Sequence, residues 1–182
     1  MGIDPEVEKP TRKMLDHVVH GELEQAGRAF EAVGDQERQL ECIALCVSVA
    51  GYIAIDVCGN QWPTDASLRT IAKDTAETAK GTTTGRPLGL TEAEIYKYLA
   101  RSALGFEPLD QVFPPVGEAL TLPILITARL LLTFRPSDKH WWEYLDVIED
   151  AIEKAATIDL SVLPAMMLRS RRPGTKGQRA VS

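Results

Sequence analysis

The sequence predicts an all-α fold, a single-domain bundle of six or seven helices with a flexible basic C-terminal tail. Helical periodicity runs through almost the whole chain, whereas sustained period-two alternation and Asn-Gly hairpin pairs are missing. Glycines, prolines and capping residues divide the periodic pattern into segments of helical length. We therefore expect a helical domain over residues 1–168 and a basic, disordered tail over residues 169–182.

Two short amphipathic helices are expected first. Thr11 can cap the first helix, which Gly21 interrupts. The second runs over about residues 22–33, where Gly34 ends it and Asp35 can cap the next helix.

The third helix is expected over about residues 36–57 and is apolar on most sides. Its polar positions form one narrow stripe of Glu41, Ser48, Tyr52 and Asp56. Such a helix lies in the middle of a bundle or against another chain.

The next two helices along the chain carry clear capping signals. Thr64 or Asp65 caps the first, which a loop rich in Gly and Thr follows over residues 81–90. Thr91 and Glu94 have the spacing of a capping box and begin the second.

Two long helices complete the domain. One is expected over about residues 116–134, bent at Pro123, and Ser137 or Asp138 caps the other. The segments 36–57 and 116–134 should form the centre of the bundle, and any apolar surface left uncovered on them would form a homodimer interface.

Charge is distributed unevenly along the chain. The formal net charge is −6, yet no acid follows Asp159. Five basic residues lie in the tail: Arg169, Arg171, Arg172, Lys176 and Arg179. An acidic body repels nucleic acid and anionic lipid, whereas a basic tail attracts both. The tail can grip phosphates, fold onto an acidic protein surface, or simply solubilise the terminus.

The last long helix is crowded with acids opposite its apolar stripe. They are Glu143, Asp146, Glu149, Asp150 and Glu153. Paired carboxylates can carry acid–base chemistry or bind cations. Their position indicates first a solvated face, and such a face can also dock a basic partner.

Asp56 and Arg129 are each the only charged residue in the apolar part of an expected helix, 36–57 for Asp56 and 116–134 for Arg129. If the two helices pack together, the two side chains can meet as a buried ion pair, in which each needs the other. Alternatively, each lies on a narrow polar stripe and reaches water.

Cysteines and histidines give no metal or cofactor signature. Cys42 and Cys46 lie on a continuous apolar stripe, which favours core packing over a metal site. His17 and His20 follow no ligand pattern, and His140 is a general-base candidate only by its position before two tryptophans.

The compartment is predicted from the same features. An odd number of cysteines and an acidic N-terminal segment indicate reduced thiols in the cytoplasm. Two apolar stretches, residues 42–58 and 120–134, are each shorter than the roughly 20 residues that span a bilayer. No membrane partner is therefore expected.

The run Leu68 to Ala72, followed by Ile95 and Tyr96, resembles the helix-turn-helix of bacterial TetR-type repressors. That motif joins its helices by three or four residues, whereas about ten intervene here. No residue role is carried over from that family.

Three functions are compatible with these features. The first is a non-enzymatic interaction protein, an assembly or regulatory subunit that binds a protein partner or a second copy through helix faces and the tail. The second is a nucleic-acid-associated regulator. The third is an enzyme with a helical cleft near His140, which requires a polar pocket with converging titratable groups.

Overall fold

The structure is a computed structural model that describes residues 3–80, 90–100 and 121–156. Seven helices and no strand occur in these three ranges. They are α1 (Pro5–Val19), α2 (Leu23–Glu31), α3 (Gln36–Val57), α4 (Asp65–Lys80), α5 (Glu92–Tyr98), α7 (Thr121–Phe134) and α8 (Trp141–Ala156). The predicted all-α class is confirmed. The predicted tail and nearly all of the predicted 81–90 loop lie outside the described residues.

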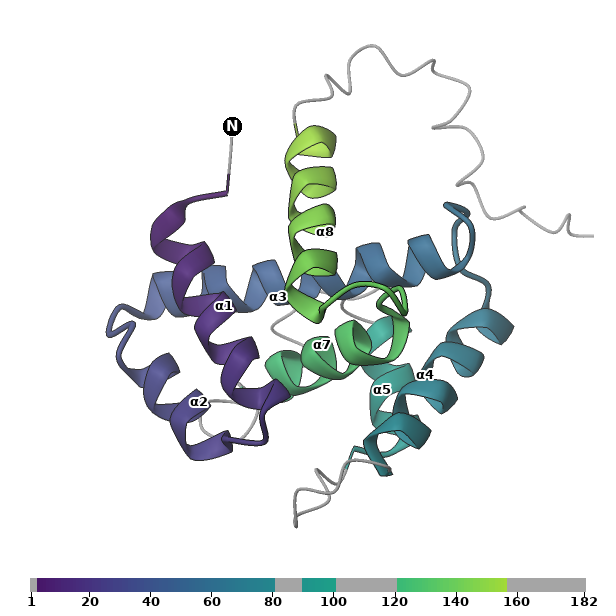
Figure 1. The fold of residues 1–182 in the computed structure, drawn as a ribbon, viewed down its shortest axis with the longest axis horizontal. Coiled ribbons are helices and arrows are strands. Elements are labelled where there is room, and N and C mark those ends of the chain that lie inside the picture. Colours follow the sequence, from purple (N-terminus) through teal and green to yellow (C-terminus); the bar gives the residue numbers. More distant parts are fainter. Residues whose placement is uncertain (1–2, 81–89, 101–120, 157–182) are drawn as a thin grey trace, which may run out of the picture.

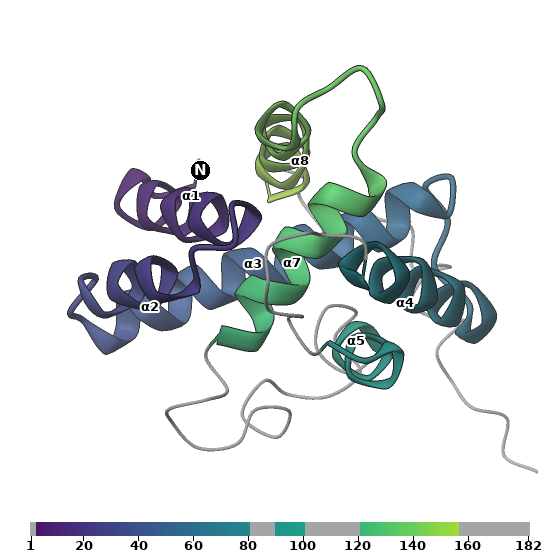
Figure 2. The ribbon, with the colours of Figure 1, turned by 60° about the horizontal axis from the view of Figure 1, so that its bottom comes forward.

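α3 and α7 form the centre of the described fold. α3 contacts α1, α7 and α8, and α7 also packs on α1 and α4. Figure 1 shows α3 running across the molecule behind α1 and α8, and Figure 2 shows α7 crossing it. α2 packs on α1 at one side of this centre, and α5 packs on α4 at the other. The helices predicted to be central therefore take that place.

A continuous apolar core joins these helices. Its fully buried side chains include Met14, Leu15, Ile53, Ile95, Leu130, Leu131, Leu145 and Ile148. Burying one such side chain stabilises the fold by roughly 1.5–3 kcal/mol. The polar stripe predicted for α3 lies on its outer side, where Glu41 and Ser48 are exposed and Tyr52 and Asp56 are half-buried.

Most helix ends follow the signals in the sequence. Gly21, Gly34 and Gly59 have φ angles of 79°, 73° and 67°, the left-handed conformation that terminates helices. The Asp35 carboxylate caps α3. Thr91 caps α5 within a complete capping box.

The start of α1 differs from the prediction. The helix begins at Pro5 because the Asp4 carboxylate accepts a hydrogen bond from the Glu6 N–H at 2.9 Å, and proline needs no donor at a first helical position. Thr11 is no cap. It is buried in the helix, and its hydroxyl donates to the Val7 carbonyl at 2.7 Å.

The start of α8 also differs. Neither Ser137 nor Asp138 caps it, because these residues belong to a turn in which the Lys139 N–H donates to the Pro136 carbonyl at 3.0 Å. The helix begins at Trp141.

Candidate interaction surfaces

A groove lies between α1 and α2. It encloses about 290 Å³ and is lined by Lys9, Pro10, Lys13, Ala29, Ala32 and Val33. Its apolar side chains are small, and its two lysines lie one helical turn apart on α1. Both lysines are exposed, and neither has an ion pair or a side-chain hydrogen bond within the described part of the chain. We call this feature the basic groove.

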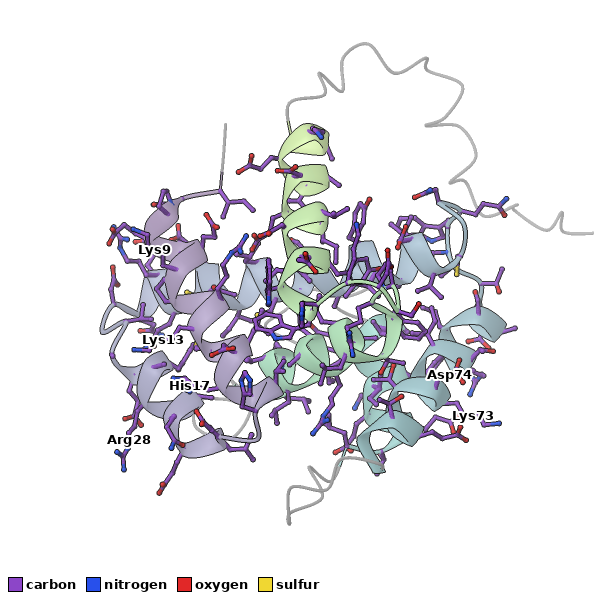
Figure 3. The ribbon with its side chains drawn as sticks, viewed as in Figure 1. Lys9, Lys13, His17, Arg28, Lys73 and Asp74 are labelled. Atoms are coloured by element: carbon purple, nitrogen blue, oxygen red, sulfur yellow. The ribbon has the colours of Figure 1, made fainter. Side chains whose placement is uncertain are left out.

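Further cationic groups extend this side of the molecule. Figure 3 shows Lys9, Lys13 and His17 in order along α1, with Arg28 beyond them on α2. Arg28 is exposed and has no ion pair with any described residue. The His17 imidazole contacts the Glu22 carboxylate at 2.7 Å. In a protein of net charge −6, two cations that line the groove and a third nearby on α2 have no ion pair with any described residue.

Arg12 does not line this groove and connects α1 with α8. Its guanidinium lies 2.6 Å from Asp146 Oδ1, 2.9 Å from Glu8 Oε1, and donates a hydrogen bond to Glu149. Glu149 is only 5% exposed. Burial raises the pKa of this carboxyl to about 7, although the nearby Arg12 charge acts in the opposite direction. Glu149 therefore does not lie on the solvated face predicted for it.

Little of the predicted acidic face of α8 is left for a partner. Asp146 binds Arg12, and the Glu143 carboxylate accepts a hydrogen bond from the backbone N–H of His140 at 2.7 Å. Asp150 is exposed and makes no such contact with a described residue. Glu143 and Asp146, two of the acids predicted to form this face, therefore act within the fold.

Asp56 and Arg129 do not form the buried ion pair considered from the sequence. Asp56 Oδ2 accepts a hydrogen bond from the Tyr144 hydroxyl at 2.8 Å. Arg129 is 3% exposed, and its Nε and Nη1 find no hydrogen-bond partner among the described residues. Burial lowers the pKa of this guanidinium. The partner of Asp56 is thus Tyr144 on α8 and not Arg129.

The cysteines behave as core residues. Cys42 and Cys46 are fully buried, and burial raises the pKa of both thiols. Cys58 is half-buried at the end of α3. Across the described ranges, no cluster of three or more His, Cys, Asp or Glu side chains could hold a metal ion.

His140, the general-base candidate, is exposed beside Trp142. The two rings stack with centroids 5.7 Å apart and an interplanar angle of 5°. The acid nearest in sequence, Glu143, is committed to the backbone N–H of His140. This arrangement resembles a helix start more than a catalytic pair.

Two further pockets differ in chemistry. One, of about 250 Å³, is lined by apolar side chains of α1, α2 and α7: Val18, Leu23, Ala26, Phe30, Ile124 and Leu125. The other, of about 390 Å³, lies between the end of α3 and the first turns of α4 and contains hydroxyl groups, Trp62 and Asp74.

The segments that resemble a helix-turn-helix lie in α4 and α5. Arg69 on α4 is already engaged, since its Nε lies 2.9 Å from Asp65 and its guanidinium carbon lies 4.4 Å from the Tyr96 ring centroid. The connection between the two helices lies outside the described residues except at Leu90.

α3 is the one described helix that is long and apolar enough to cross a membrane, judged by length and composition. A core helix of a soluble protein meets the same criterion. In this fold, 56% of the most apolar window of α3 is buried inside the protein.

Sequence reasoning missed the basic groove and the Trp62 pocket. The spacing of Lys9 and Lys13 was visible, but the packing of α2 against α1 that forms the groove was not. The five basic tail residues, Arg169, Arg171, Arg172, Lys176 and Arg179, lie outside the described residues. The chain matches no protein-family model, no curated protein and no solved structure.

Proposed function

We propose that this chain is a non-enzymatic cytoplasmic interaction protein, an assembly or regulatory subunit, whose basic groove binds an acidic segment of a protein partner. The observation that carries the proposal is a pair of exposed lysines that have no partner among the described residues and lie beside a small-residue floor. Lys9 and Lys13 offer two charges one helical turn apart, and Ala29 and Ala32 allow close approach of a helix or an extended segment.

The contrast with Arg12 supports this proposal. Arg12 lies between the two lysines in sequence and forms ion pairs with three carboxylates of its own chain. Lys9 and Lys13 are left without such partners among the described residues, although acids outnumber basic residues in the chain. Charged groups of this kind steer association and select partners of opposite charge.

A photo-reactive residue at Ala32 tests the proposal inside the cells that make the protein. We expect it to crosslink to one defined partner, and we expect the combined changes Lys9→Glu and Lys13→Glu to abolish that crosslink. A matched double reversal on the other side of the fold, Lys73→Glu with Lys97→Glu, should leave it intact. A crosslink that survives Lys9→Glu with Lys13→Glu would show that the two lysines do not hold the partner.

The same experiment reports self-association. If the crosslinked product has twice the mass of the chain, the acidic segment belongs to a second copy, and the protein forms a homodimer. A larger product containing another protein identifies a heteromeric assembly.

A nucleic-acid-associated regulator is the second candidate. It is favoured by Lys9, Lys13 and Arg28, which pair with no described residue, and by the five basic residues of the tail. Binding of the full chain and of a chain ending at Leu168 to duplex and single-stranded nucleic acid, over a salt series, tests it. Steep salt dependence that truncation removes would support this candidate. No binding at low salt would remove it.

A further inference from the structure

A second recognition feature lies between the end of α3 and the first half of α4. The pocket of about 390 Å³ is lined by Val57, Cys58, Gln61, Trp62, Thr64, Ser67, Thr70, Ile71 and Asp74. Asp74 is the only charged group in that lining. Its carboxylate has no hydrogen bond or ion pair with any described residue, whereas the neighbouring Lys73 pairs with Glu77 at 4.0 Å. Figure 3 shows Lys73 and Asp74 on α4.

Trp62 provides an aromatic wall for this pocket. It is 54% exposed, so its ring is accessible to a ligand in the pocket. The turn that carries it is well held, because the Asn60 N–H donates to the Ile55 carbonyl at 3.0 Å and Pro63 is buried. The indole is thus presented from a fixed backbone.

A ring on α5 and a carboxylate on α4 already bind one arginine within the protein. Arg69 lies over the Tyr96 ring at 4.4 Å and contacts Asp65 at 2.9 Å, and the Tyr96 hydroxyl donates to the same carboxylate. Ring and carboxylate hold one guanidinium between them. The pocket at Trp62 and Asp74 contains the same two parts but no cation among its lining residues.

We propose that this pocket binds an arginine side chain from a basic segment of a partner protein. The guanidinium would stack on Trp62 and pair with Asp74, and the methylene groups would lie against Val57 and Ile71. Charge complementarity selects this occupant, since the pocket has a single negative charge and no positive one. The proposal is independent of the basic groove, which selects the opposite charge at the other side of the fold.

Fluorescence anisotropy with the full chain and a labelled arginine-serine repeat peptide tests this assignment. The matched probe replaces each arginine by citrulline, which keeps the shape and removes the charge. We expect Asp74→Asn and the citrulline probe each to weaken binding by about ten- to a hundredfold. Trp62→Leu should weaken it by about two- to fivefold. Circular dichroism checks that each variant keeps its helical content.

Glu77→Gln is the control, because it makes the same charge change one turn along α4, outside the pocket. It should alter binding by less than twofold. Equal losses in Asp74→Asn and Glu77→Gln, or equal binding of the arginine and citrulline probes, would overturn the assignment. If the peptide binds only to a chain ending at Leu168, the tail arginines of this chain fill the pocket, and the assignment to a partner is wrong. None of these results bears on crosslinking at Ala32.

Discussion

Glu149 on α8 binds Arg12 on α1 across a separation of 137 positions in the sequence. The carboxylate is buried, and its second oxygen, Oε1, has no hydrogen-bond partner among the described residues. Arg12 also contacts Asp146 and Glu8, so one guanidinium organises three acids at the junction of two helices. Because a buried carboxylate depends on its cation, this contact makes the junction sensitive to both mutation and pH.

Arg12→Met should destabilise the protein by about 2–3 kcal/mol at mildly alkaline pH, since it leaves the Glu149 charge buried and unpaired. The loss should be smaller at mildly acidic pH, where Glu149 takes up a proton. Chemical denaturation at the two pH values measures it. Adding Glu149→Gln to Arg12→Met should recover part of the lost stability. An equal loss in the single and double variants would contradict the pairing.

Glu149 should also make the wild-type protein less stable as pH rises. Burial raises its pKa to about 7 from an ordinary 4.5, so the folded state binds this proton more tightly than the unfolded state. Its contribution to stability is full below the unfolded pKa and is lost as pH rises through the folded pKa. Between about pH 5 and about pH 8 the change is on the order of 3 kcal/mol.

Glu149→Gln isolates this effect, because glutamine does not titrate while every other group is unchanged. The free energy of unfolding should fall more steeply with pH in the wild type than in this variant. Parallel pH profiles would show that the Glu149 pKa is close to its ordinary value.

Leu131→Ala should cost about 2–5 kcal/mol, because Leu131 is fully buried on the central helix α7 and its loss leaves a cavity. Leu40→Ala makes the same chemical change at a position that is 55% exposed on α3, and it should stay within about 0.5 kcal/mol of the wild type. Thermal or denaturant unfolding compares the pair. Similar losses would mean that Leu40 is covered in solution, as a homodimer through α3 would require.

Tyr144→Phe should cost about 1–2 kcal/mol, because it removes the hydroxyl that donates to Asp56. Asp56→Asn keeps an oxygen acceptor at the same place and should cost less than Tyr144→Phe. This order of the two losses is expected if Tyr144 is the partner of Asp56. If Asp56→Asn were instead as damaging as breaking a buried ion pair, about 3–5 kcal/mol, Arg129 would be its partner after all.

The fold class and most helix ends could be predicted because they depend on local signals. The periodicity of α3, the left-handed Gly34 and Gly59, and the Thr91 capping box all act within a few residues. The start of α1 differs from the prediction because Thr11 has the residue type of a cap, whereas Asp4 caps the helix and Thr11 is buried.

The surfaces could be predicted less well because they depend on contacts between distant segments. Glu149 shares a helix with solvated acids, and only the approach of Arg12 from α1 explains its burial. Asp56 has a tyrosine partner that sits 88 positions away. The basic groove likewise needs α2 and its C-cap to place Ala29 and Ala32 next to the lysines of α1.

A partner site in the basic groove is tested most directly by the affinity of the acidic segment that crosslinks at Ala32, prepared as a peptide and titrated into the full chain at low salt. We predict that Lys9→Glu with Lys13→Glu weakens binding at least about tenfold, and that Lys73→Glu with Lys97→Glu changes it by less than about twofold. Equal losses in the two double variants, or no loss in either, would contradict a partner site in the basic groove.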